Sequence, residues 1–389
     1  MPNALPKRAG GGVRFNTGGA DAQNGIDVLV ASKYEALRGM RVGLITNHTG
    51  IDRIGNPTID LLRSAPGVSL VALFSPEHGI RGVADEKVGD TVDVVTVLPI
   101  YSLYGERRQP SAEQLASLDA LVYDIQDVGT RFYTYEATLG LAMEALNGTK
   151  IKFIVLDRVN PIGGTIVEGP VLEGPTDFVG YHTVPVRHGM TVGELARMYR
   201  AEKNLDVDLN VIEVKNWKRD MWQDEAGLPW INTSPNMRSL AEAALYPGIG
   251  LLESAVSVGR GTSTPFEVAG APYIDGEKLA REITALALPG VKVTTIHFTP
   301  DASIHKGESC AGVRFTITDR KTLRPVDLGI AVATILERDY PSQFPLDKMQ
   351  RLVRHPATLD AIRAGKPLGE IHSLWISDFA ERRAKYLLY

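Results

Sequence analysis

Glu77 and His78, a carboxylate beside an imidazole, stand where an apolar run of the sequence stops. Residues 68–74 are nearly all apolar, which predicts a β-strand covered on both faces. Ser75 and Pro76 end that strand because proline has no amide hydrogen with which to extend the ladder. Since α/β proteins bind ligands just beyond the carboxyl ends of parallel strands, the Glu-His pair is a candidate for acid–base chemistry. The structural alternative is the first turn of a helix with His78 at the surface.

Polar side chains follow three other predicted strands in the same way. The carboxyl ends of parallel strands lie at one edge of a sheet, so we expect these side chains to converge on one crevice. They are Asn47 and His48 after the first strand; Asp124, Gln126, Asp127, Arg131, Tyr133 and Tyr135 after the fourth; and Asp157, Arg158 and Asn160 after the fifth.

The residue types narrow the class of ligand. Carboxylate, amide, guanidinium and phenol groups suit a polyhydroxylated, amide-bearing molecule. Tyr133, Tyr135, Trp222 and Trp230 could add apolar faces for sugar rings, although core packing is the alternative for each Trp.

Phosphate and metal chemistry are poorly supported by the motifs. Residues 259–262 (GRGT) resemble neither a P-loop nor a dinucleotide fingerprint, and no G-x-G-x-x-G follows the first predicted strand. His48, Glu77, His78 and Asp124 are of metal-ligand types but lack H-E-x-x-H or comparable spacing. We therefore expect no cofactor and no metal. A metal-dependent hydrolase built on His48, Glu77 and His78 stays as an alternative.

Composition excludes several functional classes. The 389 residues carry a net charge of −4 without a basic cluster, so no nucleic-acid partner is expected. Cys310 is the single cysteine, which rules out an intrachain disulfide and a cysteine-based zinc site. No apolar stretch is long enough for a membrane span. Residues 1–25 lack the apolar core of a signal peptide and are expected to be a disordered leader, which favours a cytoplasmic location for the chain as written.

Strand and helix patterns alternate from Gly25 onward, which predicts an α/β fold with a doubly wound, mostly parallel sheet and right-handed crossovers. The expected strands are residues 41–47, 68–74, 96–101, 120–125, 151–157 and 207–214. The expected helices are residues 58–64, 111–118, 134–146 and 191–201, the last opened by a capping box at Thr191 and Glu194.

The remaining segments depart from the alternation of strands and helices. Residues 163–174 are rich in Gly and Pro and are expected to form a hairpin or long loop at the sheet edge, and residues 216–261 are expected to form long ordered loops. Helices at 276–286 and 326–340 with strands at 291–298 and 311–318 predict a smaller α+β unit. The expected domains are residues 26–275 and 276–389.

Several long motifs together resemble one known family. They are NHTGID, FSPEHGIRG, YDIQDVGTRFYTY, LDRVNPIGG, EGPVLEG, SPNM and YPGIGLLESAVSVGRGTSTPFEVAGAP, in this order from about residue 26 to the C-terminus. The chain is similar to the family long catalogued as domain of unknown function 1343, the exo-β-N-acetylmuramidases of glycoside hydrolase family 171.

The resemblance implies a Rossmann-like domain, a smaller C-terminal domain and an active site between them. It also implies release of N-acetylmuramic acid from the non-reducing ends of peptidoglycan fragments, so the expected partner is a small muropeptide or amino-sugar substrate. Many relatives are exported or lipid-anchored, from which this chain departs by lacking a signal peptide.

Glycoside hydrolysis commonly needs a general acid and a second group that activates water or attacks the sugar. We expect Glu77 to be the acid, with a pKa raised by burial, and Glu168 to be the second carboxylate, ahead of Glu173 and Asp127. A substrate-assisted route is the alternative, in which Asp127 with Tyr133 or Tyr135 would stabilise the attacking acetamido group.

Substrate recognition requires a group for the lactyl carboxylate of muramic acid. A guanidinium can bind a carboxylate through two parallel hydrogen bonds, and Arg260 is the first candidate, with Arg131 and Arg158 behind it. His78 is expected to orient Glu77 or a sugar hydroxyl. The other expected substrate contacts are Asn47, Gln126, Asp127, Tyr133, Tyr135, Asn160, Asn236 and Thr262. A non-catalytic amino-sugar-binding protein is the alternative outside the enzymes.

Overall fold

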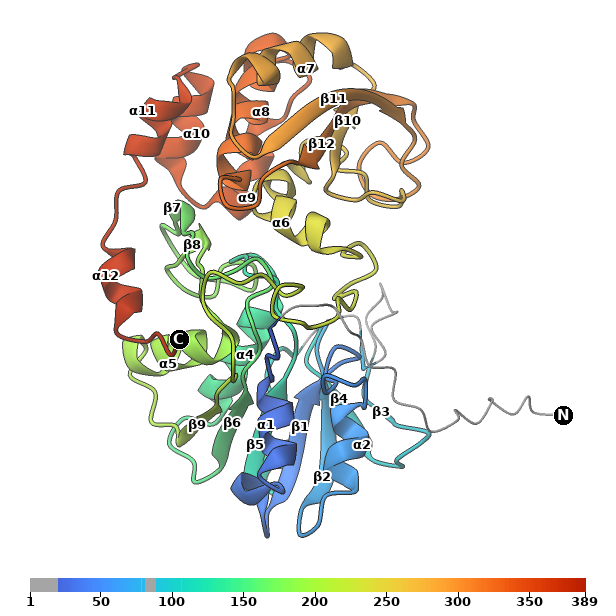
Figure 1. Cartoon of the computed structure of the whole chain (residues 1–389), viewed down its shortest axis with the longest axis vertical. Coiled ribbons are helices and arrows are strands. Elements are labelled where there is room, and N and C mark those ends of the chain that lie inside the picture. The colour runs from blue at the N-terminus through green and yellow to red at the C-terminus, as the bar shows by residue number, and fades with distance from the viewer. Residues whose placement is uncertain (1–19, 78, 81–88, 106) are drawn as a thin grey trace, which may run out of the picture.

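Apolar strands separated by polar loops form the expected sheet (Figure 1). The computed structural model describes residues 20–77, 79–80, 89–105 and 107–389. Within this part, seven strands lie in the order β3-β4-β2-β1-β5-β6-β9, and all neighbours are parallel except β3 and β4. Their bounds are β1 Arg41–Thr46, β2 Ser69–Ser75, β3 Thr91–Val92, β4 Pro99–Ser102, β5 Ala120–Asp124, β6 Lys152–Leu156 and β9 Leu209–Ile212.

The six parallel strands, ranked by their place in the chain, lie in the order 3-2-1-4-5-6 of a Rossmann-like sheet. The doubly wound α/β prediction is therefore confirmed. The strand order reverses between β1 and β5, and the loops beyond their carboxyl ends form a crevice there.

Helices cover both faces of this sheet, so successive strand residues enter two different cores. Leu121 and Tyr123 pack into one core, whereas Ala120 and Val122 pack into the other. Helices α4 (Tyr135–Ala145) and α5 (Val192–Glu202) contribute to the first core, and α1 (Gly25–Ala31) and α2 (Thr58–Arg63) to the second. The short α3 (Ala112–Leu115) and η1 (Glu35–Leu37) complete this part. Double coverage explains why the strands read as continuous apolar runs.

The predicted capping box of α5 is confirmed. The Thr191 hydroxyl accepts a hydrogen bond from the Glu194 amide at 3.3 Å, and the Glu194 carboxylate accepts one from the Thr191 amide at 3.0 Å. These two reciprocal bonds give hydrogen-bond acceptors to two backbone amides that have no partner within the helix.

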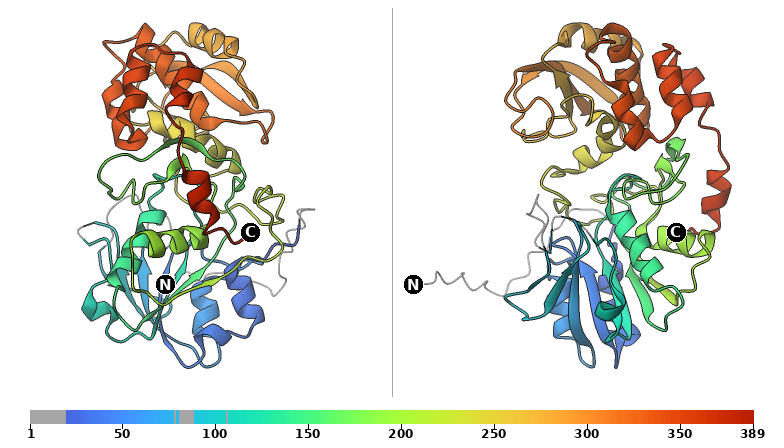
Figure 2. Two further views of the ribbon diagram at one scale, coloured as in Figure 1. Left: turned by 90° about the vertical axis from the view of Figure 1, so that its left-hand side faces the viewer. Right: turned by 180° about the vertical axis from the view of Figure 1, so that it is seen from behind.

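A smaller domain stacks above the carboxyl edge of the sheet (Figures 1 and 2). Its antiparallel sheet has the order β10-β12-β11, and it packs against α7 and α8. The bounds are α6 Leu240–Ile249, η2 Gly250–Leu252, β10 Val268–Ala271, α7 Gly276–Ala285, β11 Val291–Phe298, β12 Cys310–Ile317, α8 Pro325–Asp339, η3 Leu346–Met349, α9 Gln350–Val353, α10 Pro356–Arg363, α11 Leu368–Ser373 and α12 Phe379–Ala384.

The expectation that residues 216–261 form only long loops is wrong, because α6 lies within them. Ser239 and Glu242 form a capping box at its start, and the segment from Glu242 to Ile249 is buried. Pro247 inside the helix obscured it in the sequence, since proline is unfavourable in a helix interior.

Helix α6 and strand β10 precede residue 276 but pack with elements that follow it. A Cβ atom on Gly248 would lie 1.5 Å from the Pro325 carbonyl oxygen, so α6 and α8 touch backbone to backbone at this glycine. Strand β10 is hydrogen-bonded to β12. We propose that the smaller domain begins near residue 240 rather than at residue 276.

Replacing Gly248 with Ala is expected to destabilise the protein by about 1–3 kcal/mol, because the added methyl group must force α6 away from α8. Gly369→Ala is the matched control: it also lies in a helix, and its Cβ would meet no atom within 4 Å. The melting temperature should fall for the first variant only. Equal melting temperatures would contradict the close approach.

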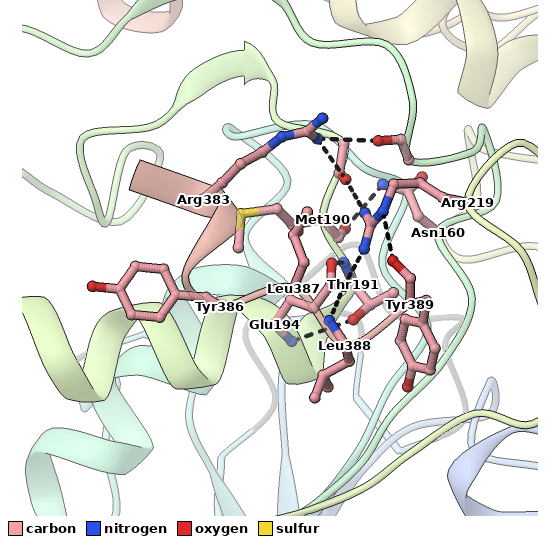
Figure 3. A network of polar contacts seen from close by, with 12 residues as sticks. Asn160, Met190, Thr191, Glu194, Arg219, Arg383, Tyr386, Leu387, Leu388 and Tyr389 are labelled. Atoms are coloured by element: carbon pink, nitrogen blue, oxygen red, sulfur yellow. Dashed lines mark hydrogen bonds and ion pairs between the residues drawn. The ribbon is translucent and has the colours of Figure 1, made fainter. Parts of the chain in front are cut away.

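The C-terminal residues return to the Rossmann-like domain (Figures 1 and 3). The Tyr389 hydroxyl donates to Asp157 at 2.7 Å, and the Leu388 amide donates to Glu194 at 2.9 Å. Arg219 pairs with Glu194, and its guanidinium and that of Arg383 both donate to the Gly189 carbonyl. This network ties the end of the smaller domain to the start of α5.

Part of the expected leader is held in the fold. Residues 1–19 lie outside the described residues, but residues 20–25 are fixed, which corrects the prediction of disorder through residue 25. The Gln23 amide donates to the Lys215 carbonyl at 2.9 Å, and the Asn24 amide donates to Asp27 at 2.9 Å. No helix among the described residues is long and apolar enough to span a membrane.

Candidate active site

A cavity of about 590 Å³ lies where loops of the Rossmann-like sheet meet the smaller domain. Residues from the loops after β2, β4 and β5 supply one side, and residues near η2 and in α9 supply the other. The lining residues are Glu77, Tyr104, Arg108, Phe132, Tyr133, Thr134, Tyr135, Asp177, Phe178, Val179, Ser234, Tyr246, Glu253, Ser254, Arg260, Arg351 and Leu352.

Glu77 lies in this cavity, two residues beyond the end of β2, as a strand-end residue should. Its side chain is half-buried, and the Thr134 hydroxyl donates to its Oε2 at 2.5 Å. Tyr104 also hydrogen-bonds Glu77; burial, followed by this bond, raises the pKa of Tyr104 to about 12. Two hydroxyl groups therefore hold the carboxylate in one orientation. His78, its expected partner, lies outside the described residues.

Tyr133 and Tyr135 form an aromatic wall of the cavity. Their rings meet edge to face with centroids 5.0 Å apart. The Tyr133 hydroxyl donates to the Thr233 hydroxyl at 2.7 Å, and that of Tyr135 donates to the Thr233 carbonyl at 2.9 Å. Burial raises the pKa of both tyrosines, so both stay protonated at neutral pH.

Asn47 contacts one of these tyrosines, since its side-chain amide donates to the Tyr135 hydroxyl at 3.0 Å. It does not line the cavity, so it supports Tyr135 instead of contacting a ligand there. The two tryptophans Trp222 and Trp230 also lie outside the cavity lining.

Arg260 is the fourth predicted position that reaches the cavity. Its guanidinium pairs with Glu253 at 2.7 Å and lies over the Phe266 ring, 5.1 Å from its centroid. Asn236 and Thr262 do not line the cavity. They fix the Arg260 loop, because the Asn236 side chain accepts from the Gly261 amide at 3.2 Å and the Thr262 hydroxyl donates to the Gly259 carbonyl at 2.7 Å.

Three of the polar side chains after β5 and β6, which we expected to contact substrate, do not line the cavity and are bonded inside the fold instead. Arg158 pairs with Asp124 at 2.6 Å, with both side chains buried. Gln126 donates to the Val159 carbonyl at 3.0 Å, and Asn160 donates to the Met190 carbonyl at 2.9 Å. These bonds hold the strand-end loops together below the cavity.

Arg131 is also a structural residue and not a ligand for the lactyl group. Its guanidinium is buried and donates to four backbone carbonyls, at distances from 2.6 to 3.0 Å. The four acceptors are Pro170, Val184, Leu352 and Val353. Since the last two belong to α9, this side chain joins the two domains.

Glu168 does not line the cavity and is not brought to Glu77. It starts β7 (Glu168–Val171), which pairs with β8 (Pro185–Arg187), so the expected hairpin segment does contain a strand. Its buried carboxylate accepts from the Asp327 amide in the first turn of α8 at 2.9 Å. The side chain thus caps a helix of the other domain. Glu173 also lies outside the lining and meets His355 at 3.4 Å.

Asp127 lies in a buried group with Glu136 and His188, whose ligand-type atoms are within 4.8 Å of one another. The Met190 amide donates to His188 Nδ1 at 3.1 Å, so the ring proton resides on Nε2, which faces Glu136 at 2.7 Å. A metal bound at Nε2 would require the ring proton to move to Nδ1, where the Met190 amide already donates. The hydrogen bonding therefore favours a proton-sharing group over a metal site. Asp127 is outside the cavity, which corrects its assignment as a substrate contact.

Asp127 should make stability depend on pH. Burial raises its pKa from 3.8 to about 7. The unfolded chain releases this proton above about pH 4 and the folded chain only near pH 7, so its stabilising contribution is complete below pH 4 and is lost as pH rises to 7. We expect the melting temperature to fall less steeply with pH in Asp127→Asn than in the wild type.

The exposed Asp60→Asn variant is the control for this measurement. Parallel melting curves for the wild type and Asp127→Asn between pH 4 and 8 would contradict a buried, protonated Asp127.

Sequence reasoning missed several lining residues: Tyr104, Arg108, Asp177, Phe178, Glu253 and Arg351. Glu253 lies within the quoted motif that contains Arg260, so proximity to that Arg was a usable signal. Arg351 had no local signal, because only the packing of the two domains brings α9 to the sheet.

Comparisons with known proteins agree along the whole described fold. Residues 42–241 match the N-terminal and residues 244–389 the C-terminal domain profile of the exo-β-N-acetylmuramidase NamZ. The chain is 41% identical over 377 residues to the peptidoglycan β-N-acetylmuramidase NamZ of Bacillus subtilis strain 168, covering 94% of this chain and 91% of that protein.

Two solved structures of DUF1343 family proteins from Bacteroides fragilis NCTC 9343 have the same fold. One has a TM-score of 0.89 at 38% identity and the other a TM-score of 0.78 at 32% identity. Each comparison covers 95% of this chain and 99% of the solved chain.

Proposed function

The chain belongs to the NamZ family of exo-β-N-acetylmuramidases, and from this membership we propose how its cavity releases N-acetylmuramic acid from peptidoglycan fragments. It is a glycoside hydrolase that acts at the non-reducing end of such fragments. Its substrate is a small amino sugar derivative, and we propose a short muropeptide or glycan fragment with a terminal muramyl residue.

One observation carries the mechanism: Glu77 is held by two hydroxyl groups in a cavity with aromatic walls. A glycosidase needs a carboxyl group fixed beside the glycosidic oxygen, and rigid placement contributes much of its effect. Glu77 is the general acid that protonates the leaving oxygen, and Tyr133 and Tyr135 provide a face against which the sugar ring packs.

Glu253 is the second carboxylate of this mechanism. It lines the same cavity, and its carboxylate accepts a hydrogen bond from the Arg260 guanidinium at 2.7 Å. Burial, then the charge of Glu253 and to a lesser degree that of Glu77, raises the pKa of Tyr246, which lines the same cavity as both carboxylates. An ionised carboxylate opposite a general acid can activate water or attack the anomeric carbon.

The alternatives are less well supported by the positions of their residues. Asp127, which the substrate-assisted route would use, is buried outside the cavity. His48, which a metal-dependent hydrolase would use, does not line it, and its Nε2 contacts the Asn232 carbonyl.

Hydrolysis of a chromogenic β-N-acetylmuramide, compared with the corresponding β-N-acetylglucosaminide, tests the function. The wild type should release the chromophore from the muramide and not from the glucosaminide. Release from neither, or from the glucosaminide alone, would overturn the proposed substrate. Activity that disappears with a chelator and returns with a divalent metal would instead favour the metal-dependent alternative.

A further inference from the structure

Among the residues that the structure describes, three arginines line the active-site cavity, and one of them has a carboxylate partner there. Arg260 pairs with Glu253 at 2.7 Å. The other carboxylate that lines this side, Asp177, pairs with Arg354 at 3.1 Å. Among the described residues, Arg108 and Arg351 form no ion pair with a carboxylate, although both line the cavity.

Arg108 and Arg351 reach the cavity from different domains. Arg108 follows β4 of the Rossmann-like sheet, and Arg351 belongs to α9. Both positive charges act on the Tyr104 hydroxyl, which hydrogen-bonds Glu77. The Arg108 guanidinium stacks over Phe178 at 4.4 Å from the ring centroid, which fixes its plane. Two cations therefore line the same cavity as the carboxyl group assigned to catalysis.

We propose that Arg108 and Arg351 bind the lactyl carboxylate of the terminal muramyl residue and thereby distinguish it from an N-acetylglucosaminyl residue. The assignment rests on the proposed function. Two guanidinium groups that find no acidic partner in the described part of the chain repel each other, and a bound carboxylate relieves that repulsion while accepting charge-assisted hydrogen bonds. Arg260 is less suited to this role because Glu253 already occupies it.

Arg131 is the positioning residue for Arg351. Its buried guanidinium donates to the carbonyls of Leu352 and Val353, at 2.6 and 2.8 Å. These residues directly follow Arg351 and end α9. The Rossmann-like domain therefore fixes the helix that delivers the second cation, so recognition requires both domains in their packed arrangement.

The test compares two chromogenic β-N-acetylmuramides, one with a free lactyl carboxylate and one with the neutral lactyl methylamide. The variants are Arg108→Ala and Arg351→Ala, with Arg107→Ala and Lys348→Ala as controls on exposed neighbouring cations outside the cavity. We expect kcat/KM for the acid to fall by about 10- to 100-fold, mainly through KM, in each cavity variant. The same variants should lose much less kcat/KM on the methylamide than on the acid.

An equal loss on both substrates, or no loss on the acid, would overturn the assignment. Arg260→Ala tests the other hypothesis, that Arg260 binds the lactyl carboxylate. Under the present proposal, loss of the Arg260–Glu253 pair should slow hydrolysis of both substrates alike. A selective loss on the acid in Arg260→Ala alone would move the lactyl site to that residue.

Binding measured by calorimetry tests carboxylate recognition separately from the proposed hydrolytic function. If the wild type hydrolyses neither muramide, binding of free N-acetylmuramic acid is compared with that of N-acetylglucosamine. A preference for the acid that disappears in the Arg108 and Arg351 variants would still support carboxylate recognition. Binding without preference, or a preference that survives both substitutions, would refute it.

Discussion

Glu77→Gln is expected to lower kcat by about 10²–10⁴-fold, the contribution typical of a general acid or base. The amide keeps the size of the side chain and can still accept from the Thr134 hydroxyl, so the fold and substrate binding should be retained. Single-turnover hydrolysis of the chromogenic muramide and calorimetry with N-acetylmuramic acid would measure the two effects separately.

Glu277→Gln is the matched control, since this glutamate is exposed on α7 and distant from the cavity lining. It should retain wild-type turnover. A loss of less than tenfold in Glu77→Gln would remove Glu77 from the catalytic role and direct attention to Glu253.

Arg131→Met is expected to destabilise the protein by at least about 3 kcal/mol, because each buried carbonyl left without a donor costs about 1–3 kcal/mol. Methionine retains much of the apolar stem but offers no hydrogen to the four carbonyls that the guanidinium now satisfies. Burial lowers the pKa of Arg131 to about 9, so the wild-type side chain is still charged at neutral pH.

Differential scanning calorimetry measures this effect, with Arg320→Met as the control. Arg320 forms a partly exposed pair with Asp224, and such pairs contribute little. The melting temperature of Arg131→Met should fall by several degrees and that of Arg320→Met should stay close to the wild type. Equal stability of the two variants would show that the interdomain carbonyls do not depend on Arg131.

Local sequence patterns predicted most of the Rossmann-like domain because its elements are specified by short-range chemistry. Apolar runs between polar loops specified the strands, and the pairing of Thr191 with Glu194 specified a helix start. Helix α6 escaped prediction because Pro247 locally disfavours a helix that tertiary packing stabilises.

The candidate site was predicted less completely than the fold. Glu77, Tyr133, Tyr135 and Arg260 reach the cavity as expected. Arg158 and Asn160 are of equally suitable types but satisfy buried acceptors, because strand-end loops need internal hydrogen bonds as well as ligand contacts. Residue type and position at a strand end do not distinguish side chains that bind ligand from side chains that hold the loops together.

The sequence by itself determined the fold class, the family motifs and the placement of Glu77 at the end of a strand, because each depends on neighbours along the chain. Only the tertiary structure decided which charges share the cavity. It placed Glu168 against the first turn of α8, paired Arg260 with Glu253, and brought Arg351 to the cavity that Arg108 also lines. These outcomes depend on how two domains pack, and that packing arises from many distant contacts that no local pattern records.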